Sequence, residues 1–143
     1  PARGVNEGVA YFLLKTEPSA YSYADLVRDG STVWNGVKNS VAQKHIRSAQ
    51  KGDLVIVYHT GKDKHAAGVA EITTAAYPDP KDPKLYVFDL AARQPLTQTV
   101  TLAALKAEVA FRDSPLLRLG RLSVVPLTPE QWQTLLRLGQ TRG

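Results

Sequence analysis

Cysteine is absent from the 143 residues of this chain, and so is methionine. Without cysteine the protein has no disulfide, no thiolate nucleophile and no thiolate metal ligand. No stretch approaches the roughly 20 apolar residues that a membrane-spanning helix needs, and the first residues lack the apolar run of a signal peptide. We therefore expect a soluble, cytoplasmic protein that makes no membrane contact.

Motifs that carry catalysis are missing as well. The chain has no P-loop, no dinucleotide-binding glycine pattern and no Gly-x-Ser-x-Gly turn. Its three histidines, His45, His59 and His65, lack the spacing of metal ligands, so we expect no metal and no cofactor. Glu17 and His59 could pair as acid and base, but nothing places a nucleophile beside them. Binding is therefore favoured over catalysis.

Acidic residues are missing between Asp29 and Asp53, a segment that contains Lys38, Lys44, Arg47 and Lys51. Together with the formal net charge of +5, this local positive charge favours a polyanionic partner. The apolar spacing predicts a helix over 41–50 with Lys44 and Arg47 on its outer face. Such a face is equally typical of an ordinary solvated helix.

The segment 32–40 combines a large aromatic residue, a glycine and two amides where a turn is usually small and polar. One interpretation places Trp34 in the core and makes Asn35-Gly36 a hairpin turn. The other makes the segment one wall of a pocket that stacks a flat ligand. Composition and turn chemistry alone favour the first.

The order of elements predicts one domain with a small, curled sheet. Strands are expected at 10–14, 53–60, 66–77, 85–93, 96–100 and 121–127, and helices at 23–29, 41–50, 102–109 and 129–138. Ser22 with Asp25, and Thr128 with Pro129, are typical helix starts. Three prolines in 78–84 predict a surface loop. Because the elements do not alternate as βαβ units, a barrel-like sheet with peripheral helices is the better prediction.

A series of short motifs resembles the EVE domain family over residues 10 to 138. In chain order they are Tyr11-Phe12-Leu13-Leu14-Lys15-Thr16-Glu17-Pro18, Tyr21-Ser22, Asp25-Leu26, Trp34-Asn35-Gly36-Val37-Lys38-Asn39, Ala42, Lys51-Gly52-Asp53, Tyr58-His59-Thr60, Gly68, Tyr77-Pro78-Asp79 and Arg121-Leu122-Ser123-Val124. The resemblance covers nearly the whole chain.

The resemblance implies an α+β fold, a PUA-like pseudo-barrel of five to six mostly antiparallel strands flanked by short helices. It places a single domain at 10–139, between a flexible N-terminal segment at 1–9 and a tail at 140–143. EVE domains are regarded as binders of modified nucleic-acid bases, and no catalytic activity is attributed to the domain. We therefore expect a monomeric, non-enzymatic reader of a modified base in DNA or RNA.

Carried over by motif, the resemblance implies a base pocket and a phosphate-contacting surface. The pocket would comprise Lys15, Thr16, Glu17, Pro18, Trp34, Gly36, Val37, Asn39, Tyr58, His59 and Thr60, with Tyr58 to Thr60 facing the wall formed by Trp34 to Asn39. The phosphate contacts would be Lys38, Lys44, Arg47 and Arg121. Two alternatives remain: a nucleic-acid-processing enzyme or nuclease subunit that uses Glu17 and His59, and a protein-interaction domain with a vestigial pocket.

The motifs depart from the family pattern at a few places. The family usually has Ser where Thr16 and Thr60 stand, Asp at Asn35 and Arg at Lys38, and these exchanges keep a hydroxyl, a polar side chain and a positive charge. The loop after Tyr77-Pro78-Asp79 is shorter than in many members, which bears on how fully a ligand is enclosed.

Overall fold

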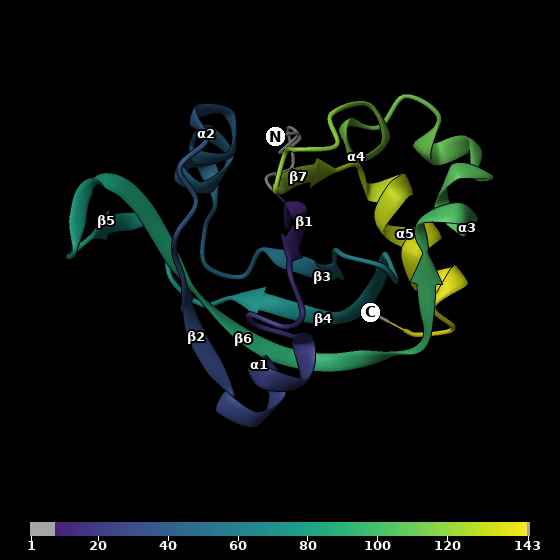
Figure 1. The fold of residues 1–143 in the computed structure, drawn as a ribbon, viewed down its shortest axis with the longest axis horizontal. Coiled ribbons are helices and arrows are strands. Elements are labelled where there is room, and N and C mark those ends of the chain that lie inside the picture. Colours follow the sequence, from purple (N-terminus) through teal and green to yellow (C-terminus); the bar gives the residue numbers. More distant parts are fainter. Residues whose placement is uncertain (1–7, 143) are drawn as a thin grey trace.

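A seven-stranded sheet forms the centre of the molecule (Figure 1). The computed structural model describes residues 8–142, so most of the expected segment 1–9, and Gly143 of the tail, lie outside the described residues. The strands are β1 (Tyr11–Thr16), β2 (Ser31–Trp34), β3 (Leu54–His59), β4 (His65–Ile72), β5 (Tyr77–Asp79), β6 (Asp82–Thr101) and β7 (Val124–Leu127).

The strand order is β2-β6-β4-β3-β1-β7, with β5 paired to β6. The pair β1 and β3 is parallel, and all the other pairs are antiparallel. The predicted mostly antiparallel sheet is therefore confirmed. The number of strands is seven rather than five or six, because β2 and β5 are too short to be distinguished from turns by their sequence.

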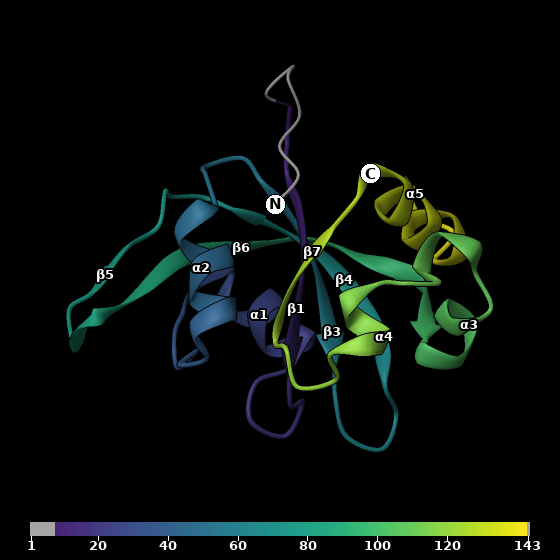
Figure 2. The same ribbon diagram turned by 90° about the horizontal axis from the view of Figure 1, so that it is seen from above.

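Six short helical segments lie around the sheet in the part of the chain that the structure describes. They are α1 (Tyr23–Asp29), α2 (Ser40–Ser48), α3 (Leu102–Lys106), the 3-10 turn η1 (Val109–Phe111), α4 (Pro115–Arg118) and α5 (Pro129–Leu138). Figures 1 and 2 show α2 and the β5 hairpin at one end of the sheet, and α3, α4 and α5 at the other. No helix within residues 8–142 is both long enough and apolar enough to span a bilayer.

Local sequence signals set the boundaries of α1 and α5 as predicted, whereas the helices expected at 41–50 and 102–109 run from Ser40 to Ser48 and from Leu102 to Lys106. Ser22 and Asp25 form a reciprocal capping box at α1, and Thr128 forms a second one with Gln131 at α5, where Pro129 occupies the first turn. Each cap satisfies backbone N–H groups that have no partner within the helix. These ends therefore depend on nearby residues rather than on the packing of the domain.

Strand β1 is buried in the middle of the core. Phe12, Leu13 and Leu14 are almost inaccessible to solvent, because β3 and β7 flank the strand on its two edges. At its start the Tyr11 ring stacks on Trp132 of α5, with the ring centroids 4.7 Å apart. The second tryptophan of the chain is thus a core residue that holds α5 against the sheet.

Strand β6 overturns two expectations. The sequence predicts separate strands at 85–93 and 96–100 after a loop at 78–84, whereas one strand continues from Asp82 to Thr101 and β5 pairs with its start. Pro95 lacks an N–H for a regular ladder, and register shifts in the β4–β6 pairing accommodate it. Pro78 is tolerated because β5 lies beside a single partner strand.

Helix α1 packs closely on β4 at Gly68. The Tyr23 hydroxyl donates a hydrogen bond to the Val69 carbonyl at 2.7 Å, and its ring covers Gly68. A Cβ atom at position 68 would lie 2.3 Å from Cζ of Tyr23. Position 68 therefore has no room for a side chain between β4 and the Tyr23 ring.

We predict that Gly68→Ala lowers the free energy of unfolding by about 1–3 kcal/mol, because the added methyl group displaces the Tyr23 ring. Urea unfolding measures the change. Gly120→Ala is the matched control, since a Cβ at that position meets nothing within 4 Å. An unchanged urea midpoint for Gly68→Ala would contradict the prediction, because it would show that the Tyr23 ring can move away without loss of stability.

Candidate functional site

A cavity of about 200 Å³ opens where β1 ends beside β2. The end of β1, the turn before α1 and the end of β2 contribute its lining: Thr16, Tyr21, Thr32, Val33, Trp34 and Asn35. Pockets for drug-sized ligands measure roughly 300–1,000 Å³. The cavity is therefore of a size to hold one small, flat group.

Two aromatic side chains form its walls. Trp34 is only 9% exposed and belongs to the core cluster, yet it also lines the cavity. The Tyr21 ring meets it edge-on, with a centroid distance of 6.4 Å and an interplanar angle of 77°. Trp34 is thus a core residue that also forms part of the cavity wall.

The turn that carries Tyr21 is fixed by hydrogen bonds. The Thr16 hydroxyl donates to the Tyr21 carbonyl at 2.6 Å, and the Tyr21 hydroxyl donates to Asp29 at 2.8 Å. Glu17 accepts the Ser19 N–H at 2.8 Å with its carboxylate, and its carbonyl accepts the N–H of Tyr21. Partial burial and the neighbouring Asp29 raise the pKa of Tyr21, so its hydroxyl stays protonated.

Residues 35–39 connect β2 to α2. The interpretation of Asn35-Gly36 as a hairpin turn is wrong, because the next element is a helix rather than a paired strand. Gly36 has φ 80°, a left-handed conformation that costs glycine little. The Asn39 side-chain oxygen then accepts the N–H groups of Val41 and Ala42 and caps α2.

Gln43 secures this connection from inside. Its side-chain N–H group donates to the Val37 carbonyl at 2.8 Å and to the Tyr86 carbonyl at 3.1 Å, while its oxygen accepts the Tyr86 N–H at 2.8 Å. The residue is 4% exposed. Gln43 was not among the residues predicted for the site, and its one signal in the sequence is its place beside Ala42 on the inner side of α2.

The expected pocket residues at the end of β3 do not line the cavity. Tyr58 is 2% exposed and does not line it, so its ring offers no face to a ligand there. The Thr60 N–H donates to the Thr16 carbonyl at 2.9 Å and thereby supports the cavity wall. The second aromatic wall, which was expected from Tyr58, comes from Tyr21 instead. Tyr21 was predicted only as part of a family motif.

His59 supports the start of α1. Its Nε2 atom accepts the Tyr23 N–H at 2.9 Å, and its ring lies edge-on to that of His65 at a centroid distance of 5.0 Å. Burial, and to a smaller extent the charge of His65, lowers the pKa of His59, and Glu17 acts in the opposite direction. With its Nε2 lone pair occupied, His59 is poorly placed to take a proton from a substrate.

Lys15, near the end of β1, and Pro18, in the turn after it, do not line the cavity. The Lys15 ammonium donates to the Gly120 carbonyl at 2.9 Å, and burial lowers the pKa of Lys15. Pro18 and Glu17 lie in the turn that leads to Tyr21. Their contribution is thus to the shape of the wall.

Exposed basic side chains surround α2. Lys38, Lys44, Arg47 and Arg121 are all exposed, and none forms a salt bridge with another residue of 8–142. The Arg47 guanidinium lies 6.0 Å from the Tyr86 ring centre, which limits its motion. In the described part of the chain, no group of three or more His, Asp or Glu side chains is arranged to hold a metal ion.

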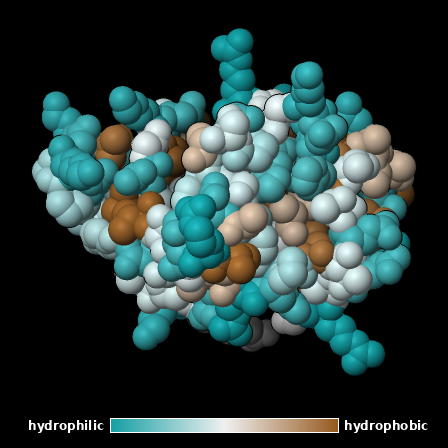
Figure 3. Space-filling model, turned by 60° about the horizontal axis from the view of Figure 1, so that its bottom comes forward, coloured by the Kyte–Doolittle hydropathy of each residue, from teal (hydrophilic) through white to brown (hydrophobic). Residues whose placement is uncertain are grey.

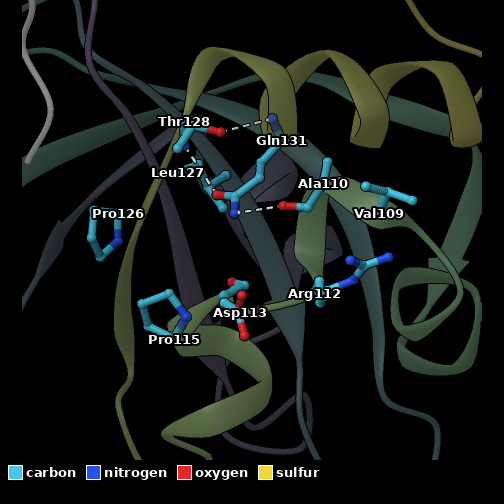
Figure 4. A pocket seen from close by; sticks show the side chains of 10 residues that line it. Val109, Ala110, Arg112, Asp113, Pro115, Pro126, Leu127, Thr128 and Gln131 are labelled. Atoms are coloured by element: carbon cyan, nitrogen blue, oxygen red, sulfur yellow. Dashed lines mark hydrogen bonds between the residues drawn. The ribbon is translucent and has the colours of Figure 1, made fainter.

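A larger hollow of about 580 Å³ lies at the other end of the sheet (Figure 4). Gln131 lines it, but the amide donates to the Ala110 carbonyl and accepts the Thr128 N–H, so it joins α5 to η1. Asp113 adds a carboxylate to the lining (Figure 4). This hollow has neither the aromatic walls nor the surplus of positive charge found near Trp34.

We predict that the protein loses stability as the pH falls from 7.5 to 5.5. The folded state holds the His59 proton less tightly than the unfolded chain, so stability declines as the pH passes the ordinary histidine pKa of about 6.5. Urea unfolding of the wild type and of His59→Gln measures this, because glutamine keeps an acceptor for the Tyr23 N–H but does not titrate. His45, whose pKa burial also lowers, contributes equally to both proteins. An equal loss in both would remove His59 as the cause.

Comparison with known proteins places this geometry in a family. The EVE domain matches residues 10–138. Protein Rpa0253 of Rhodopseudomonas palustris, solved by NMR, is 41% identical, with a TM-score of 0.88 over 92% of this chain and 94% of that one. Human THYN1, solved in complex with 5-methylcytosine containing DNA, is 25% identical, with a TM-score of 0.84 over 94% and 99% of the two chains.

A curated relative is longer than this chain. The uncharacterized protein C21.03c of Schizosaccharomyces pombe is 26% identical over 159 residues, a match that covers 96% of this chain and 63% of that protein. The fold is thus the PUA-like α+β fold that the sequence predicted, and the chain belongs to the EVE domain family.

Proposed function

We propose that this protein binds a modified nucleobase in DNA or RNA, without chemical turnover, in the cavity at Trp34. The observation that carries the proposal is the combination of a small aromatic cavity with exposed basic side chains on and near α2 that form no salt bridge within residues 8–142. The complex of the relative THYN1 with 5-methylcytosine containing DNA supports it.

The cavity offers both stacking and edge recognition. A base that stacks on an aromatic ring gains about 1–3 kcal/mol, and Trp34 supplies that ring. The Thr16 hydroxyl already donates to Tyr21, so it is left to accept a hydrogen bond from a base. Asn35, which also lines the cavity, carries an amide that can donate and accept. These groups choose among bases by their edges.

A methyl group on the base adds apolar contact inside such a cavity. Burial of one methylene-sized group contributes about 0.8 kcal/mol, which corresponds to roughly a fourfold change in affinity. A single methyl group therefore gives modest discrimination, and larger selectivity requires the polar edge of the base. The volume of about 200 Å³ favours a single-ring base.

The strand that carries the base would contact the basic residues. We assign phosphate contacts to Lys38, Lys44, Arg47 and Arg121, which are exposed and unpaired within the described residues. A base in a duplex must be flipped out at a cost of a few kcal/mol, which a single strand avoids. We therefore expect single strands to bind more tightly than duplexes of the same sequence.

We predict that a single-stranded oligonucleotide with one 5-methylcytosine binds more tightly than its unmodified counterpart, and that Tyr21→Leu weakens binding about tenfold by removal of one aromatic wall. Fluorescence anisotropy measures both. Tyr21 is chosen because Trp34→Ala would open a core cavity that costs about 3–5 kcal/mol of stability. The matched control is Tyr77→Leu, a partly exposed tyrosine on β5.

Three outcomes would redirect the assignment. Indifference to every modification and to Tyr21→Leu would reject the cavity as a base pocket. Release of product from a labelled oligonucleotide, lost in Glu17→Gln, would favour an enzyme. A protein that binds no nucleic acid but copurifies with a protein partner would favour an interaction domain.

Salt dependence tests the phosphate contacts separately. We predict that Lys44→Gln and Arg47→Gln each reduce the slope of log affinity against log salt by about 0.7 on single strands, because one fewer counterion is released. Lys106→Gln is the control, since α3 lies at the opposite end of the sheet from α2 (Figure 1). Equal slopes in all four proteins would place the nucleic acid elsewhere.

A further inference from the structure

Another hollow, of about 360 Å³, lies between the start of α2 and the segment that leads into β7. It is called the α2 notch here, and its lining is Asn39, Val41, Leu119, Gly120, Arg121 and Leu122. Val41 is 48% and Leu119 is 53% exposed, and both line the same hollow, so they present apolar surface to it together. Elsewhere, on the face in Figure 3, apolar residues form separate small patches among polar ones.

The notch is linked to the Trp34 cavity by one short segment. Asn35 lines the cavity and Asn39 lines the notch, so the two linings are four steps apart along the chain. A chain of that length spans at most about 14 Å. One nucleic-acid strand can therefore reach both hollows at once.

Lys15 supplies a cation at the notch. Lys15 is adjacent in sequence to Thr16 of the cavity, and its ammonium donates to the carbonyl of Gly120 in the notch at 2.9 Å. An ammonium has three N–H donors, so others remain for a phosphate. With Arg121 in the notch and Lys38 in the connecting segment, the path between the hollows is lined by positive charge.

The chemistry of the notch suits a planar heterocycle. Val41, Leu119 and Leu122 give apolar surface for the face of a ring. The Asn39 oxygen is occupied by Val41 and Ala42, which leaves the side-chain NH₂ group to donate to a ring edge. The Gly120 carbonyl retains a second lone pair that can accept.

We propose that the α2 notch holds the base next to the modified one, so that the protein reads two consecutive nucleotides. This inference rests on the proposed function of the Trp34 cavity and adds a second contact that depends on sequence context. The larger hollow in Figure 4 does not compete for this role, because the charges of Arg112 and Asp113 in its lining balance each other and it lies at the opposite end of the sheet.

The test uses single-stranded DNA with one 5-methylcytosine, in which the neighbouring nucleotide on either side is replaced by an abasic one. We expect the abasic site on one side to weaken binding about tenfold and the one on the other side to have little effect. Fluorescence anisotropy with each strand gives the two ratios of affinity.

Val41→Glu tests the location. A carboxylate at this position is compatible with the start of α2, where acidic residues are favourable, but it makes the notch polar and negative. We expect the ratio between the intact and abasic strands to fall to about one. Ser40→Glu carries the same charge on the adjacent residue outside the notch lining, so it should weaken both strands alike. Leu119→Glu provides a second variant if Val41→Glu does not fold.

The outcomes separate the two proposals. Equal affinity for intact and abasic strands, with preference for 5-methylcytosine retained, overturns the notch and leaves the Trp34 cavity in place. A one-sided preference that Val41→Glu abolishes, without preference for any modification, supports the notch and rejects the modified-base function. Failure to bind every strand overturns both.

Discussion

The parallel pairing of β1 with β3 is the constraint on which the candidate site depends. Because the two strands run in the same direction, they end together, with Thr16 beside His59. The Thr16 carbonyl accepts the Thr60 N–H just beyond the pair. In an antiparallel pair the two carboxyl ends would lie at opposite edges. The parallel arrangement instead releases the Tyr21 turn at the same edge as the polar end of β3.

The connection from Trp34 to Asn39 depends in turn on helix α2. Asn39 ends the connection as the cap of the helix, and Gln43, one turn later, holds the Val37 carbonyl from below. A buried amide is favourable only when its groups are paired, and the backbone of Tyr86 completes the pairing here. The same helix therefore provides both the basic surface and the internal support of the segment between the two hollows.

The sequence predicts those features that depend on neighbours in the chain. The apolar run at Phe12 and the caps at Ser22 and Thr128 are local, and the family motifs identify Trp34 and Thr16 as cavity residues. The continuity of β6 through Pro95 depends on register shifts in its pairing with β4, at which β6 carries the extra residues, and no local pattern reveals them. Tyr58 and Tyr21 differ in a similar way. Tyr58 lies on the buried strand β3 and Tyr21 in the turn before α1, and only the folded arrangement shows which of the two rings lines the cavity.

Trp34 belongs to the hydrophobic core while one part of it lines the cavity. A surface aromatic residue loses rotamer freedom when a ligand orders it, and that loss reduces affinity. For Trp34 the core has already removed this freedom during folding. The ring is thus preorganised, and a flat ligand that stacks on it keeps nearly all of the contact energy it gains.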